Sequence, residues 1–327
     1  MSMAAGGLAT RGALAAAALL AGLASAQAPK QPGPPPTPLE VRLGEAWRWR
    51  TIDGAEGPGT VFRVVRPGRE GGLLALDEEG LASYDGWNWH RGAGWNVMTD
   101  EDARDFAPLQ DGLLLVGSNS VFTINAHGAL NTVGPGSGPA SVSRACHHDD
   151  GLIDIACNGQ IERASLDRLD PFLEAPPGVE EITAIAHQRD GSMWCATRQG
   201  FFRQEGEGWS KMGPVPEAYG RVIWYPIALA AGDRILFLPE RIDSLIPCVA
   251  WDGEELEAIR PPGPSMTVCD ATTTEEDAII VANRTPDLLV WREGVWHTVP
   301  VPSLTDEALS PVHRRSLHYG SLAEVGS

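Results

Sequence analysis

The chain has 327 residues, and its 43 acidic and 25 basic side chains give a formal net charge of -18. Nucleic-acid phosphates and anionic lipid surfaces repel a polyanion of this kind, so neither is an expected partner. The 37 glycines and 26 prolines disfavour long helices, and with a hydrophobic content of 43% they favour many short strands joined by tight turns.

The N-terminus predicts a secretory signal peptide over residues 1–26. Arg11 precedes an apolar run, Gly12 to Leu23, which leads into a small-x-small cleavage site at 24–26. The run is shorter than the roughly 20 apolar residues that cross a bilayer, so a retained membrane anchor is the weaker alternative. Residues 27–38 are rich in proline and predict a stiff linker, or an unstructured tail. The mature chain is expected to be periplasmic or secreted, with no membrane span.

A repeat of near-constant length follows over residues 39–327. Each copy holds a turn and then a short apolar strand, with intervals of 40, 39, 40, 41, 45 and 43 residues. The turns lie at Gly72, Gly112, Gly151, Gly191, Gly232, Asp277 and, more faintly, Gly320. A second signal, Gly-x-x-Trp or a degenerate form, predicts an outer hairpin in each copy. It occurs at Gly44/Trp47, Gly86/Trp89, Gly128/Asn131, Gly206/Trp209, Gly253/Leu256 and Gly294/Trp296, with a seventh position near Leu169–Asp170.

A period near 40 with β-type apolar runs is typical of β-propeller blades, which are small four-stranded sheets stacked around an axis. The first outer-hairpin signal has no inner signal before it, and the last inner signal has no outer one after it. Residues 304–327 would supply the inner strands and residues 39–51 the outer strands of one composite blade, which hides both terminal edges. The sequence thus predicts an all-β, seven-bladed propeller with 2+2 terminal closure. Six blades with loose ends is the alternative.

One stretch of the repeat resembles a known family. Residues 189–203 are similar to the two-component regulator propeller repeat, which reads roughly D-G-x-L-W-x-G-T-x-x-G-L-x-R with a later G-x-x-W. The matching positions are Gly191, Trp194, Thr197, Gly200 and Trp209, and Ala196 replaces a family glycine. Such propellers usually form the periplasmic sensing part of hybrid kinases, and standalone secreted forms also occur. The resemblance implies a propeller that binds a ligand or a protein, or acts as a scaffold, with a sensory role in the family.

The motif search favours binding over catalysis. Gly-x-Ser-x-Gly, His-Glu-x-x-His and phosphate-binding glycine loops are absent, so no catalytic residue, metal site or cofactor is predicted. The dense run His147-His148-Asp149-Asp150 is expected to be a solvated turn, because adjacent strand residues point to opposite faces. The alternative from a different class is a propeller hydrolase or lyase that acts on an extracellular glycan or peptide.

A ligand site is expected at the mouth of the central channel, where the loops that enter the inner strands gather. The residue seven positions before the repeat turn is Asp105, Arg144, Ala184, Tyr225 or Asp270 in successive copies. Arg221 and Trp224 lie close by in sequence. The polar members of this set predict a site for an unknown protein, a polar small molecule or a glycan. A hydrated channel without a ligand gives the same composition and remains an alternative.

The remaining expectations concern tryptophan and cysteine. The tryptophans that recur with the repeat are expected to pack between blades, where a large aromatic surface contributes most. They are Trp89, Trp194, Trp209 and Trp296. Cys146 and Cys157 flank the turn at Gly151, so a disulfide between them is a candidate, although the hairpin places them diagonally and a bridge would be strained. Two free thiols are the alternative.

Overall fold

The computed structural model contains only β-strands within its described residues, with no helix. These residues are 62–67, 73–77, 80–84, 89–91, 105–109, 111–117, 120–125, 129–134, 142–143, 145–147, 152–157, 159–263, 265–274, 276–283 and 287–300. The all-β prediction is therefore confirmed for the described part of the chain.

The first three blades follow in chain order as four-stranded antiparallel sheets. Blade 1 is β1 (Phe62–Pro67), β2 (Leu73–Asp77), β3 (Gly80–Tyr84) and β4 (Trp89–Arg91). Blade 2 is β5 (Asp105–Leu109), β6 (Gly112–Val116), β7 (Val121–Asn125) and β8 (Leu130–Thr132). Blade 3 is β9 (Cys146–His147), β10 (Ile153–Cys157), β11 (Gln160–Ala164) and β12 (Leu169–Glu174).

The next three blades carry two additions. Blade 4 is β13 (Ile182–His187), β14 (Met193–Thr197), β15 (Phe201–Glu205) and β16 (Gly208–Gly213). Blade 5 is β19 (Ile227–Ala231), β20 (Arg234–Leu238), β22 (Cys248–Trp251) and β23 (Leu256–Ile259). Blade 6 is β24 (Met266–Thr273), β25 (Ala278–Asn283), β26 (Asp287–Arg292) and β27 (Val295–Pro300). The additions are a hairpin, β17 (Glu217–Ala218) with β18 (Arg221–Val222), and the short strand β21 (Arg241–Ile242).

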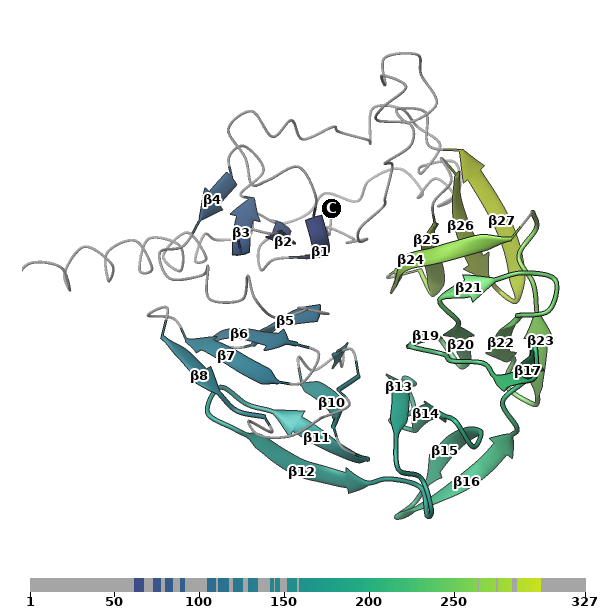
Figure 1. Cartoon of the computed structure of the whole chain (residues 1–327), viewed down its shortest axis with the longest axis horizontal. Helices are drawn as coiled ribbons and strands as arrows, with labels where there is room; N and C mark the ends of the chain where they lie inside the picture. The colour runs from purple at the N-terminus through teal and green to yellow at the C-terminus, as the bar shows by residue number, and fades with distance from the viewer. Residues whose placement is uncertain are drawn as a thin grey trace, which may run out of the picture.

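The sheets stand side by side around a common centre, and the first strand of each blade is the innermost (Figure 1). Six of the seven repeat turns predicted from the sequence open or directly precede the second strand of a blade: β2, β6, β10, β14, β20 and β25; the seventh, at Gly320, lies outside the described residues. Several of these turns need a left-handed residue, as at Gly191 (φ 83°), Gly232 (φ 65°) and Asp277 (φ 57°). The propeller arrangement is thus confirmed. The composite blade from residues 39–51 and 304–327 lies outside the described residues, so seven blades remain a prediction.

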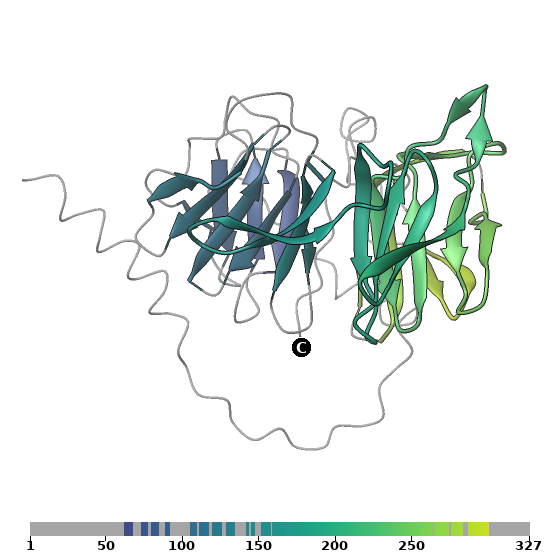
Figure 2. The same cartoon turned by 90° about the horizontal axis from the view of Figure 1, so that it is seen from below.

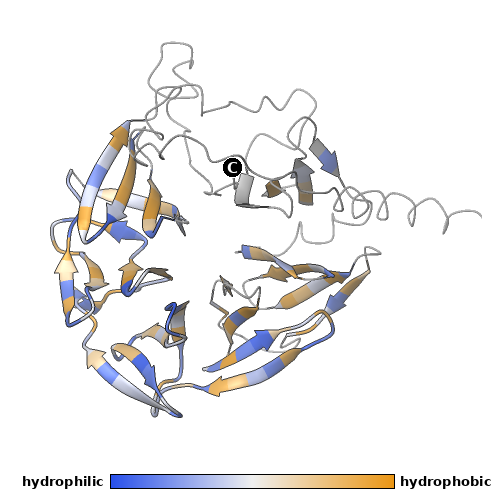
Figure 3. Ribbon diagram, turned by 180° about the vertical axis from the view of Figure 1, so that it is seen from behind, coloured by the Kyte–Doolittle hydropathy of each residue, from blue (hydrophilic) through white to orange (hydrophobic). Residues whose placement is uncertain are grey.

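The hydrophobic core lies between neighbouring blades, as stacking of two-faced sheets requires. Its clusters join blades 1 and 2, 2 and 3, 3 and 4, 4 and 5, and 5 and 6. Apolar residues follow the middle strands of each blade, whereas polar residues gather at turns and on outer strands (Figure 3). The cluster of blades 4 and 5 is rich in aromatic side chains: Trp194, Phe201, Tyr225, Phe237 and Trp251.

The predicted role of the repeat tryptophans is confirmed at three positions. Trp194 is fully buried between blades 4 and 5, with its ring centroid 5.0 Å from that of Trp251. Trp209 packs against the cluster of blades 3 and 4, and its Nε1 donates to the Glu174 carbonyl at 2.8 Å. Trp296 packs against the cluster of blades 5 and 6. The Trp89 side chain lies outside the described part of the chain.

Among the contacts that join blades 4, 5 and 6 are a short strand and an ion pair. The strand β21 leaves the β20–β22 connection of blade 5 and pairs with β24 of blade 6, through Arg241 opposite Thr267 and Ile242 opposite Met266. At the β13–β14 and β24–β25 turns, the Arg189 guanidinium makes a bidentate ion pair with the Asp277 carboxylate, at 2.8 and 2.9 Å. This ion pair connects blades 4 and 6.

Candidate functional site

The channel-mouth residues predicted at the start of inner strands are buried where the structure describes them. Asp105 opens β5, and its Oδ1 accepts from the Phe106 amide at 2.9 Å. Its Oδ2 accepts from the Ala145 amide at 3.2 Å, so this carboxylate links blade 2 to blade 3. Asp270 is buried on β24. Arg144 lies outside the described residues.

Tyr225 packs in the core between blades 4 and 5. Its hydroxyl donates to the Pro247 carbonyl at 2.9 Å, and its ring meets Phe201 edge-on at 5.3 Å. Burial raises the pKa of Tyr225, and the neighbouring Cys248 adds to that rise. Asp105 and Tyr225 thus make contacts between neighbouring blades, and Asp105, Tyr225 and Asp270 are all buried.

The other two predicted residues lie on the face formed by the β16–β19, β14–β15 and β20–β22 connections, here called the loop face. Trp224 is half-buried there, and the Arg198 guanidinium lies 5.3 Å from its ring centroid. Arg198 also makes an ion pair with Glu181 at 3.1 Å. Arg221 is exposed on β18.

A tyrosine stands at the tip of the loop-face hairpin. The β17–β18 turn consists of Tyr219 and Gly220, with φ of 55° and 70°. A left-handed conformation suits glycine but costs a bulky side chain free energy, so such a residue persists only where its surroundings hold it. The Tyr219 side chain is nevertheless 67% exposed. The hairpin projects past the ends of the blade strands (Figure 2, upper right).

Asp243 holds this hairpin and the neighbouring loop together. Its Oδ1 accepts from the amides of Leu245 and Ile246, at 2.8 and 2.9 Å. Its Oδ2 accepts from the Tyr219 hydroxyl at 3.3 Å and lies 3.4 Å from Arg241 Nε. These bonds, led by that from the Leu245 amide, lower the pKa of Asp243. The carboxylate therefore fixes two connections relative to each other.

Three apolar side chains stand exposed on these two connections. Tyr219 is 67%, Val222 45% and Leu245 52% exposed. They are half of the six large hydrophobic side chains that the described residues expose, and we call these three residues the loop-face patch. Exposed apolar groups that gather on pre-formed loops are typical of interaction surfaces.

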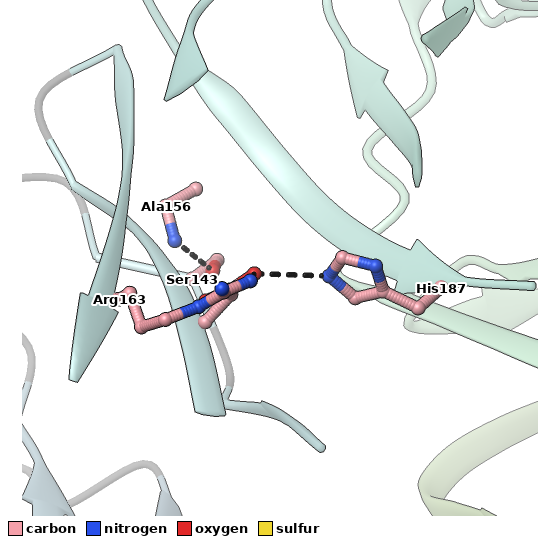
Figure 4. A network of polar contacts seen from close by, with 5 residues as sticks. Ser143, Ala156, Arg163 and His187 are labelled. Atoms are coloured by element: carbon pink, nitrogen blue, oxygen red, sulfur yellow. Dashed lines mark hydrogen bonds and ion pairs between the residues drawn. The ribbon is translucent and has the colours of Figure 1, made fainter. Parts of the chain in front are cut away.

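A buried polar cluster joins blades 3 and 4. Arg163 on β11 makes two bonds to the Asp154 carboxylate, at 2.9 and 3.1 Å, and His187 Nε2 lies 3.1 Å from Asp154 Oδ2. Arg163 and His187 approach from adjacent sheets (Figure 4). Asp154 is fully buried, so its charge requires these partners. Arg163 is partly exposed, whereas Asp154 and His187 are largely buried, and the contacts attach blade 3 to blade 4.

The five cysteines are free thiols, and the candidate Cys146–Cys157 disulfide is not formed. Cys146 pairs with Asp154 in the sheet register, whereas Cys157 pairs with Gln160 and faces Val142. The two cysteines are thus offset along β10, which keeps their sulfur atoms apart. Burial and the neighbouring Asp154 charge raise the pKa of Cys146 to about 12, so it is held as a neutral thiol.

Within the described ranges, no group of three or more His, Cys, Asp or Glu side chains is placed to hold a metal ion. No helix of membrane-crossing length and hydropathy occurs in the same part of the chain.

Sequence reasoning missed Tyr219, Leu245 and Asp243. The only signal for the first was the Tyr-Gly pair at 219–220, because a glycine there suits a two-residue hairpin turn. Asp243 acts through a hydrogen bond from Tyr219 on the β17–β18 hairpin, and no local sequence pattern indicates such a long-range contact.

The fold matches solved propellers at low sequence identity. An extracellular domain from B. thetaiotaomicron, assigned to a one component system, aligns at 14% identity with a TM-score of 0.53, over 73% of this chain and 33% of that one. An extracellular domain of a hybrid two component system from the same bacterium aligns at 10% identity and 0.52, over 73% and 34%. Virginiamycin B lyase from Staphylococcus aureus aligns at 11% identity and 0.57, over 74% and 84%.

The chain spans about a third of the length of the two extracellular domains. No protein-family model matches the sequence, and no curated protein matches it. At sequence identities this low, the similarity to these structures shows the fold alone. The described part of the chain is all-β and has the propeller fold also seen in these extracellular domains, as the resemblance to the two-component regulator propeller repeat predicts.

Proposed function

We propose that this chain is an exported propeller that binds a partner through its loop face and acts as a binding or scaffolding module. The observation that carries the proposal is the loop-face patch: Tyr219, Val222 and Leu245 are exposed together on connections that Asp243 ties into one geometry. Fixing contact residues before binding lowers the entropy cost of association.

Export is supported by the N-terminal pattern of residues 1–26 and by the extracellular location of several propellers with this fold. The resemblance to the two-component regulator propeller repeat implies that such a binding module could act as a sensor, as it does in that family. The predicted channel mouth remains a second location for a ligand, since Arg221 is exposed and Trp224 half-buried; Arg144, the third candidate, lies outside the described residues.

The test has two readouts. Expression of the full chain in a bacterial host should yield a periplasmic or secreted product that begins at Gln27, measured by fractionation and mass spectrometry. The mature protein should then capture a partner from cell-envelope and medium extracts. A Tyr219→Ala, Leu245→Ala variant should lose that partner while its thermal midpoint stays unchanged. Capture that survives this variant but fails in Arg144→Ala, Trp224→Ala would move the site to the channel mouth.

A second candidate function is a lyase or hydrolase acting on an extracellular peptide or glycan. It is favoured by the alignment with virginiamycin B lyase, which extends over 84% of that enzyme. Incubation of the chain with a streptogramin B antibiotic, followed by mass spectrometry, tests the lyase form directly. An unchanged antibiotic would remove that support.

A further inference from the structure

The charges around the loop-face patch indicate which partner it suits. Glu217 lies directly opposite Val222 in the β17–β18 pair, so the two side chains share one face of the hairpin. Arg221 is opposite Ala218 and belongs to the other face. The hairpin therefore presents a carboxylate, and not a guanidinium, beside the apolar patch.

The neighbouring loop adds a second carboxylate. Glu240 is exposed just before β21, on the connection that also carries Leu245. Among the described residues, neither Glu217 nor Glu240 has an ion-pair partner, whereas Asp243 is neutralised by Arg241. Two exposed carboxylates therefore lie on the two connections that carry the exposed apolar groups, one on each connection.

Tyr219 can bind a cation as well as an apolar group. Its ring is exposed, and the face of a tyrosine ring attracts lysine and arginine side chains. The propeller already uses this contact elsewhere, with the Arg163 guanidinium 3.7 Å from the Phe172 ring centroid. The net charge of -18 adds a long-range field that attracts cationic partners and repels anionic ones.

We propose that the partner is an extended polypeptide segment carrying apolar side chains interleaved with lysine or arginine. This proposal rests on the proposed binding function. The apolar side chains of this segment cover Val222 and Leu245. Its cationic groups meet Glu217, Glu240 and the Tyr219 ring. Association is steered by charge and anchored by apolar contact.

The experiment uses two synthetic peptides with identical leucine and phenylalanine positions, one carrying lysine and the other glutamate between them. Binding to the mature protein is measured by fluorescence anisotropy at low and high salt. The lysine peptide should bind more tightly, and salt should weaken it, because the Debye length falls to roughly 10 Å at 0.1 M. Equal or tighter binding of the glutamate peptide would overturn the proposal.

Variants separate the patch from the general charge of the chain. Tyr219→Ala should weaken binding of the lysine peptide about tenfold, the size expected for a central aromatic contact. Glu217→Gln, Glu240→Gln should weaken it at low salt. The matched control Glu254→Gln, Glu257→Gln changes the net charge equally at exposed positions of blade 5 and should have much less effect. Leu245→Ser provides a second patch variant if Tyr219→Ala fails to fold.

The outcomes distinguish this proposal from the proposed function. The control variant Glu254→Gln, Glu257→Gln could weaken binding of the lysine peptide as much as Glu217→Gln, Glu240→Gln does, or Tyr219→Ala and Leu245→Ser could leave that binding unchanged. Either result would show that the attraction comes from the general charge of the chain, and would refute the proposal of a segment with interleaved apolar and cationic side chains. A captured partner that depends on the patch but engages it with an acidic segment would also refute it, while the binding function would stand. Absence of any patch-dependent partner or peptide would refute both.

Discussion

Replacing Asp154 with asparagine is expected to weaken the attachment of blade 3 to blade 4. The carboxylate is fully buried, and it accepts two bonds from Arg163 and lies 3.1 Å from His187 Nε2. Asparagine keeps the shape but removes the charge, so a guanidinium with a side chain only 29% exposed loses its counterion. Breaking a buried ion pair costs roughly 3–5 kcal/mol, and the partial exposure of Arg163 reduces this to about 3 kcal/mol.

That free energy corresponds to a measurable change in melting temperature. For a domain of this size class, about 1 kcal/mol shifts the midpoint by roughly 2–4 °C, so Asp154→Asn should melt about 6–12 °C below the parent. Differential scanning calorimetry at neutral pH measures this. The matched control is Asp190→Asn, because Asp190 pairs with Arg203 at 3.0 Å but is 55% exposed, and it should cost below about 1 kcal/mol. An Asp154 variant that melts with the control would refute the reasoning.

Three further changes test other parts of the structure. Trp194→Ala removes a fully buried indole between blades and should lower the free energy of unfolding by about 3–5 kcal/mol, measured as a lower midpoint of urea unfolding. An unchanged midpoint would contradict the role of Trp194 in packing the blades together. Asp243→Ala should speed hydrogen exchange at the amides of Leu245 and Ile246. Because the folded pKa of Asp243 is lowered, its contribution is present above about pH 4 and is lost as pH falls through the lowered value, so the protection of these amides relative to their intrinsic exchange rates should fall there in the parent. Deleting residues 304–327 should give an aggregating or strongly destabilised chain if the terminal strands close the ring, whereas cooperative melting at the parental temperature would contradict that closure.

The blades could be predicted because the sequence repeats its turn chemistry. A left-handed glycine followed by apolar residues marks the second strand of a blade, as at Gly191 before β14 and Gly232 before β20. The packing of the repeat tryptophans could be predicted for the same reason. Trp194 and Trp209 recur with the repeat, and both pack between neighbouring blades.

Counting back a fixed number of residues from those turns reaches different parts of the inner strands, because the turns differ in length. His187 pairs with Met193 across the β13–β14 turn, whereas Ala231 pairs with Arg234 across the tighter β19–β20 turn. A fixed count therefore reaches the middle of β13 in blade 4 but a residue before β19, Tyr225, in blade 5. Contacts between distant connections, such as that of Tyr219 with Asp243, leave no local pattern to count.

The two links among blades 4, 5 and 6 affect how the ring opens. In a stacked repeat array, local opening can stop at any boundary between neighbours. Here, separating blade 5 from its neighbours breaks further contacts, because Arg189 and Asp277 join the blades on either side of it and β21 gives part of its own connection to the sheet of blade 6. We expect these three blades to form a single cooperative unit whose amides exchange together, and the loop-face patch stands on that unit.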